Sequence, residues 1–65
     1  MKTGKVKFFN DEKGFGFIVN DESGKDIFVH RSGIEDGIML TEGKSVEYEE
    51  ERGKKGMNAV RVRIV

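Results

Sequence analysis

Phenylalanine and glycine alternate in one short segment of this chain, and another phenylalanine stands in the next apolar segment. Phe15 and Phe17 alternate with Gly14 and Gly16, and Phe28 follows in a run rich in Val and Ile. Each glycine inside a strand costs about 0.5–1 kcal/mol relative to alanine, so the alternation is costly. The missing side chains let the flanking rings lie flat and let another chain approach the backbone. Flat, accessible rings can stack on nucleobases, which contributes about 1–3 kcal/mol per base.

Cationic side chains accompany these phenylalanines along the chain. Lys7 and Lys13, with Lys5 as a weaker candidate, can meet the phosphates of a strand that passes over the rings. His30 alternates with Phe28, so the two side chains share a strand face, and we expect His30 to stack as well. The alternative is an ordinary surface histidine. The pattern indicates an aromatic platform bordered by cations.

The same residue types argue against catalysis and metal binding. The chain has no cysteine and a single histidine, so it offers no thiol nucleophile and no paired-histidine ligand set. It also has no phosphate-binding loop signature. We therefore expect no enzymatic activity, no metal, no cofactor and no small-molecule substrate.

Short strands must position these side chains. Nine glycines and no proline separate runs rich in Val, Ile and Phe, which is typical of an all-β barrel or sandwich. We expect turns at 11–14, 21–24, 42–43 and 52–56, and a loop with one helical turn over 32–41. The expected strands span 5–10, 15–20, 26–30, 45–51 and 58–64.

Alternation along these strands separates an inner from an outer face. Charged neighbours and strand parity assign to the core Val6, Ile18, Ile27, Val29, Ile34, Val46, Tyr48, Val60, Val62 and Ile64. This leaves Phe15, Phe17 and Phe28 on the outer face, although an ordinary core role is the alternative for the first two. In the first strand, strict alternation puts Phe8 inward and Phe9 outward, whereas a bulge reverses the two.

Size and charge limit the class of protein. The 65 residues suffice for one domain, and the charge is balanced at twelve basic and twelve acidic residues. This balance argues against holding duplex DNA by charge, but not against binding by stacking. The glutamate run 47–51 indicates a solvated face and edge. Without cysteines, a secretory signal or an apolar membrane span, we expect a cytoplasmic, monomeric protein in a chain that looks complete.

The chain resembles the cold-shock domain family over essentially its whole length. Lys-Gly-Phe-Gly-Phe-Ile at 13–18 resembles that family's first ribonucleoprotein motif, and Asp-Ile-Phe-Val-His at 26–30 resembles the second. Residues 4–10 are similar to the family's first strand, and residues 53–59 to its last loop and strand. The resemblance implies one domain over residues 1–65, folded as a five-stranded antiparallel Greek-key barrel of the oligonucleotide/oligosaccharide-binding type.

The resemblance also implies a function and a set of contacts. Such a domain binds single-stranded RNA and DNA, acts as an RNA chaperone, and regulates transcription or translation, with a role in the cold-shock response. The resemblance also implies that Phe8 faces outward and Phe9 inward. By position, the expected contacts are Lys7, Phe8, Lys13, Phe15, Phe17, Phe28 and His30. Weaker candidates are Asn10, Asp26, Lys55 and Asn58.

Three departures from the family pattern leave affinity and base preference open. Phe8 stands where tryptophan is usual, and the loop 35–40 is shorter and lacks an aromatic residue. Arg31 stands where an aromatic residue is frequent. Its guanidinium can stack and also pair with phosphate, so we include Arg31 among the contacts. The alternative function is a small β-barrel that binds a protein partner through the same aromatic patch.

Overall fold

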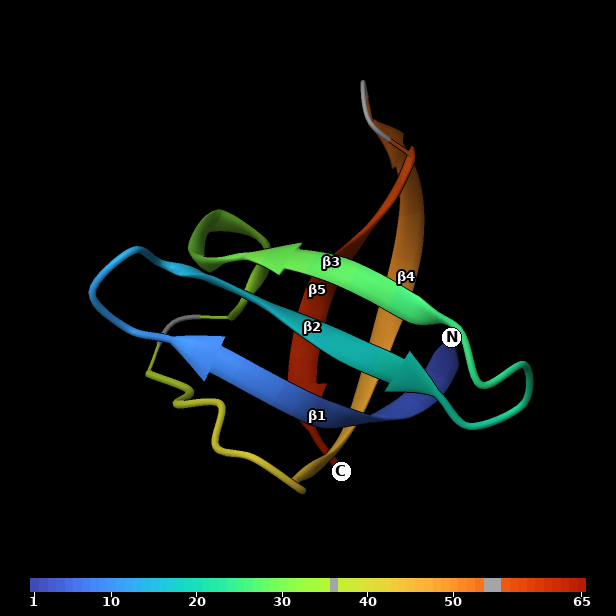
Figure 1. The fold of residues 1–65 in the computed structure, drawn as a ribbon, viewed down its shortest axis with the longest axis horizontal. Coiled ribbons are helices and arrows are strands. Elements are labelled where there is room, and N and C mark those ends of the chain that lie inside the picture. The colour runs from blue at the N-terminus through green and yellow to red at the C-terminus, as the bar shows by residue number, and fades with distance from the viewer. Residues whose placement is uncertain (36, 54–55) are drawn as a thin grey trace.

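The computed structural model describes residues 1–35, 37–53 and 56–65 of the chain. Five strands close into a barrel in the order β1-β2-β3-β5-β4, which confirms the predicted all-β barrel. β1, β2 and β3 lie side by side, and β4 and β5 cross behind them (Figure 1). The elements are β1 (Lys2–Asn10), β2 (Phe15–Asn20), β3 (Asp26–His30), the 3-10 turn η1 (Arg31–Gly33), β4 (Ser45–Gly53) and β5 (Gly56–Ile64).

The closing contact of the barrel differs from the other pairings. β1 pairs with β2 and β4, β2 with β3, and β4 with β5, all antiparallel as predicted. β3 and β5 instead run parallel, with Phe28 opposite Asn58 and Val29 opposite Ala59. This short parallel contact brings the C-terminal strand to the edge of the three-stranded layer.

The buried core agrees with most of the alternation pattern. It contains Val6, Ile18, Ile27, Val29, Leu40, Val46, Tyr48, Ala59 and Val62, with Phe9, Ile34 and Ile38 packed against it. Leu40 was not predicted, because it lies in a loop that has no strand periodicity. The predictions for Val60 and Ile64 are wrong: Val60 is half-buried and Ile64 is 40% exposed.

A bulge at Arg61 explains the error at Val60, whereas Ile64 keeps the parity of the buried Val62 and is exposed because β5 ends there. Glu47 pairs with Arg63 and Glu49 pairs with Val60, so β5 contains one residue more than β4 between these pairs. Arg61 has a φ of 53°, in the left-handed region that a bulge commonly uses. The extra residue shifts the alternation by one position, so Ala59 rather than Val60 points into the barrel.

A second bulge, in β1, decides the orientation of the neighbouring phenylalanines. Val6 pairs with Ile18 and Phe8 with Phe17, so Lys7 is the extra residue. Phe8 is 39% exposed, whereas Phe9 packs against the core. The structure thus confirms the outward Phe8 and inward Phe9 that the family resemblance implied.

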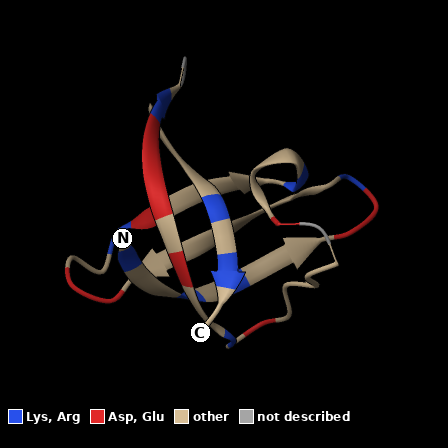
Figure 2. Ribbon diagram, turned by 180° about the vertical axis from the view of Figure 1, so that it is seen from behind, with Lys and Arg blue, Asp and Glu red and all other residues tan. Residues whose placement is uncertain are grey.

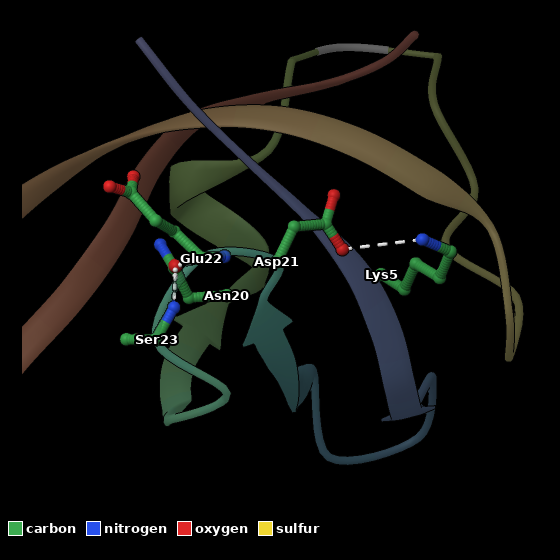
Figure 3. Close-up of polar contacts among 5 residues, drawn as sticks. All are labelled: Lys5, Asn20, Asp21, Glu22 and Ser23. Carbon is green, nitrogen blue, oxygen red and sulfur yellow. Dashed lines mark hydrogen bonds and ion pairs between the residues drawn. The ribbon is translucent and has the colours of Figure 1, made fainter.

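A buried polar contact ties the β2–β3 turn to the core. The Asn20 side chain donates from Nδ2 to the Tyr48 Oη at 2.6 Å. Its Oδ1 accepts from the backbone N–H groups of Glu22 and Ser23, each at 2.8 Å (Figure 3). Burial raises the pKa of the Tyr48 phenol above its ordinary 10.0. The charges of Glu50 and Asp21 raise this pKa further, while the Asn20 hydrogen bond opposes the shift.

The glutamate run of β4 faces arginines of β5 on the back of the barrel. Figure 2 shows acidic residues along β4 beside basic residues along β5. Arg61 Nη1 lies 2.6 Å from Glu49 Oε2, and Arg63 Nε lies 3.2 Å from Glu47 Oε1. Such exposed pairs contribute only about 0–1 kcal/mol each. The solvated face is confirmed, but the predicted edge is wrong, because β4 pairs with both β1 and β5 in the closed barrel.

Candidate nucleic-acid interface

Four phenylalanines from three adjacent strands form a contiguous aromatic surface, which we call the aromatic platform: Phe8, Phe15, Phe17 and Phe28. Phe8 pairs with Phe17 across β1 and β2, and Phe17 pairs with Phe28 across β2 and β3. Residues opposite each other in antiparallel strands project from the same face. The register therefore lines up rings from three strands.

The rings of the aromatic platform contact one another directly. Ring centroids lie 5.6 Å apart for Phe8 and Phe17, 5.8 Å for Phe17 and Phe28, and 6.0 Å for Phe15 and Phe28. Such aromatic pairs contribute about 0.5–1.5 kcal/mol beyond their buried area. Phe15, Phe17 and Phe28 are half-buried because they pack sideways, and Phe8 is the most exposed of the four. The rings of the platform thus support one another from the side.

His30 extends the platform toward the β1–β2 turn, whereas the Arg31 side chain lines a hollow with Phe9 and Ile34. His30 is exposed and pairs with Phe15 in the β2–β3 register. The Arg31 backbone N–H donates to the Gly14 carbonyl at 2.8 Å. A Cβ added at Gly14 would lie 2.8 Å from Arg31 Nη2, so the guanidinium lies directly against this glycine. Gly14 also has a φ of +75°, which favours glycine at the turn.

The structure gives Gly16 a role different from the predicted approach of another chain. Gly16 is buried, and an added Cβ would lie 2.7 Å from the Phe9 Cα and clash with the Phe8 carbonyl oxygen. The absence of a side chain therefore allows β1 and β2 to approach each other closely inside the barrel. It does not open the outer surface to a ligand.

Two of the predicted lysines are paired with carboxylates. Lys7 Nζ on β1 lies 3.0 Å from Asp26 Oδ2 on β3, so this pair reaches across β2. Lys5 Nζ lies 3.2 Å from Asp21 Oδ1 (Figure 3). Both pairs are open to solvent, so each contributes about 0–1 kcal/mol and a phosphate can compete for the lysine. Lys13 is exposed in the β1–β2 turn.

The weaker candidates have different positions. Asn10 shapes the β1–β2 turn, because its Oδ1 accepts the Lys13 backbone N–H at 3.0 Å. Asn58 is half-buried and lies opposite Phe28 in the β3–β5 pairing, at the edge of the platform. Lys55 lies outside the described residues. The structure thus brings Asp26 and Asn58 to the platform and uses Asn10 in a turn.

Two neighbours of the platform were missed by the sequence analysis. Val19 lies between Lys5 and Asp26 in the strand register and is half-buried on the same face as Phe17. Its position two residues after Phe17 could have revealed it. Ser32 contacts the His30 ring, with its Oγ 3.0 Å from Nδ1. No sequence pattern that we used could have revealed this contact.

Within residues 1–35, 37–53 and 56–65, no helix is long and apolar enough to cross a bilayer. Across the same residues, no group of three or more His, Cys, Asp or Glu side chains is placed to hold a metal ion.

Comparisons with known proteins agree with this fold. Residues 2–65 match the family model described as 'Cold-shock' DNA-binding domain. The chain is 54% identical to "Cold shock-like protein CspA" of Stigmatella aurantiaca (strain DW4/3-1), over 100% of this chain and 98% of that protein. It is 53% identical to "Cold shock-like protein" of Thermotoga maritima (strain ATCC 43589 / DSM 3109 / JCM 10099 / NBRC 100826 / MSB8), over 95% of this chain and 96% of that protein.

A solved structure supports the fold independently. The structure described as "drosophila Unr CSD456" matches 98% of this chain and 26% of its own chain, with a TM-score of 0.80 at 18% identity. At this identity the likeness concerns the fold alone. The family model and the curated relatives show that the chain belongs to the cold-shock domain family, a family of nucleic-acid-binding domains that are not enzymes.

Proposed function

We propose that this chain binds single-stranded RNA and DNA by stacking successive bases on the aromatic platform. The observation that supports the proposal is the set of four contacting rings, drawn from three strands, with centroid separations of 5.6–6.0 Å. Apolar rings gathered on the outer face of so small a protein mark a binding surface. Because the rings already support one another, binding needs little ordering of the protein.

Cations at the border of the platform supply the contacts to the backbone. Lys7, Lys13 and Arg31 reach phosphates, while His30 continues the stacking row. Three phosphate contacts predict a slope of about −2 for log K against log salt with a single strand. This weak salt dependence suits a chain whose net charge is zero. Stacking, rather than charge, therefore supplies most of the affinity.

Binding of this kind accounts for an RNA-chaperone activity. A protein that binds unpaired segments and not the hairpin shifts the equilibrium toward the open form by mass action, without ATP. As a cytoplasmic monomer, it would change the folding of RNA and thereby regulate transcription or translation, including in the cold. A quenched-hairpin assay tests this activity: added protein should open the hairpin to an extent that rises with protein concentration and needs no nucleotide.

The direct test is a titration of labelled oligo-dT and oligo-U, with a matched duplex as the control. Both single strands should bind and the duplex should bind far more weakly, because its bases are not available for stacking. Labelling is necessary because the chain has no tryptophan to report binding. Failure of both single strands at low-micromolar protein and low salt would contradict the proposal. It would favour the alternative, a protein partner on the same platform.

A further inference from the structure

His30 caps the first turn of η1 with its side chain. The residue has extended backbone angles, φ −108° and ψ 151°, immediately before η1 begins at Arg31. Its ring nitrogen Nδ1 accepts the backbone N–H of Ser32 at 3.1 Å. The Ser32 Oγ lies 3.0 Å from the same nitrogen. Both polar groups of Ser32 thus converge on one edge of the imidazole.

This contact determines where the ring proton lies. A backbone N–H can only donate, so Nδ1 must present a lone pair to it. In a neutral imidazole one nitrogen accepts and the other carries the proton, and the hydrogen bond of one nitrogen selects the tautomer. The proton of His30 is therefore on Nε2. The two nitrogens project from different edges of the ring, so the Nε2–H points away from η1.

The position of the ring places this donor at the border of the aromatic platform. His30 lies opposite Phe15 in the β2–β3 register and is exposed. Among the hydrogen bonds of the described residues, those of the His30 ring go to Ser32 through Nδ1 and none uses Nε2. An available N–H beside stacking rings can contact a bound strand.

We propose that the backbone N–H at position 32 holds His30 as the Nε2–H tautomer, and that the Nε2–H of His30 donates a hydrogen bond to the bound strand. The acceptor is an oxygen of a base or of a phosphate. The tautomer is a property of the free protein, whereas the donated hydrogen bond rests on the proposed function. His30 thus adds a directional contact that a phenylalanine at the same position could not make.

The tautomer is tested by long-range ¹H–¹⁵N correlation NMR on the free protein at mildly alkaline pH. His30 is the single histidine of the chain, so its ring signals need no further assignment. We expect the pattern of the Nε2–H tautomer. Ser32→Ala should keep this pattern, because the donor is the main-chain N–H. An Nδ1–H tautomer or an even mixture in the wild type would overturn the proposal.

The donated hydrogen bond is tested with His30→Phe, which keeps a stacking ring and removes the N–H. Binding of labelled oligo-dT should weaken about two- to tenfold, the value of one hydrogen bond. Circular dichroism checks that the variant is folded. Affinity equal to or tighter than that of the wild type would overturn the donor role.

Oligo-dT with methylphosphonate linkages then identifies the acceptor. If the affinity ratio of wild type to His30→Phe persists on this neutral backbone, the acceptor is a base oxygen. If the ratio falls to one, the acceptor is a phosphate oxygen. A wild-type protein that binds no oligonucleotide would overturn both the proposed function and the donated hydrogen bond, while the tautomer would still be decided by NMR alone.

Discussion

Replacing one phenylalanine on each face of the barrel separates binding from folding. Phe17 lies at the centre of the aromatic platform, between Phe8 at 5.6 Å and Phe28 at 5.8 Å. Phe9 lies on the neighbouring strand, packs against the core, and sits where a Cβ on Gly16 would meet its ring at 2.8 Å. Phe17→Ala and Phe9→Ala therefore remove the same atoms from opposite faces of one sheet.

The expected magnitudes follow from these positions. Loss of one stacked base costs about 1–3 kcal/mol, so Phe17→Ala should weaken oligo-dT binding about five- to hundredfold. Phe17→Ala should lower the free energy of unfolding by about 1 kcal/mol, since the ring is only half-buried. Phe9→Ala should lower the free energy of unfolding by about 3 kcal/mol, the lower end of the range for a phenylalanine packed in a core. The free energy of unfolding of the whole domain is about 3–10 kcal/mol. Phe9→Ala could therefore remove most of this stability.

Two measurements on the same samples decide the matter. Fluorescence anisotropy of a labelled oligo-dT gives the affinity, and urea unfolding followed by circular dichroism gives the free energy of unfolding. Phe9→Ala should bind within about twofold of the wild type once its folded fraction is taken into account. If Phe17→Ala unfolds the protein, or if Phe9→Ala abolishes binding while it remains folded, the assignment of faces is wrong.

Further predictions concern the core, the bulge and the lysine pair. Tyr48→Phe removes the acceptor of the buried Asn20 amide, so urea unfolding should show a loss of about 1–3 kcal/mol with unchanged oligonucleotide affinity. The folded protein holds the Tyr48 proton more tightly than the unfolded chain, because burial raises the pKa of the phenol above 10.0. Wild-type stability should therefore fall as the pH rises above 10.0 and through this raised pKa, and Tyr48→Phe should lack that part of the fall. In urea unfolding, the free energy of unfolding of Arg61→Gly should stay within about 1 kcal/mol of the wild type, because glycine adopts the left-handed backbone without strain and this offsets the lost surface ion pair. Arg61→Val keeps the strained backbone and also loses the ion pair, so its free energy of unfolding should fall by more than about 1 kcal/mol. Asp26→Asn removes the carboxylate that pairs with Lys7, so oligo-dT affinity at low salt should rise about two- to fivefold. This gain should vanish at high salt. Weaker binding would instead indicate that Asp26 itself contacts a base.

Alternation in the sequence predicted the five strands to within three residues at each end, and most of the core. Tyr48 stands between two glutamates and Val46 stands between a serine and a glutamate, so only one register buries the apolar face of this strand. The same reasoning placed Phe15, Phe17 and Phe28 together, because β2 and β3 pair without interruption. It failed for Val60, since alternation holds only as far as the next bulge, and for Ile64, which lies at the exposed end of β5.

The candidate site was predictable to the extent that it depends on one strand at a time. Phe8 was assigned by family resemblance, and the structure supplies the physical reason in the bulge at Lys7. The pairing of Lys7 with Asp26 was not predictable, because it joins two strands across a third. The hydrogen bond from Ser32 to His30 was missed for a local reason, as histidine is not among the usual capping residues.

The sequence by itself determined an outer face of phenylalanines on β2 and β3, because the spacing of apolar residues along a pleated strand determines which side chains lie together. Closure of the barrel decided the rest. Joining five short strands into a ring requires extra residues at Lys7 and Arg61, and these residues turn Phe8 outward and Ala59 inward. The position of a bulge depends on the strands that pair on either side, so it cannot be predicted from the sequence of one strand alone.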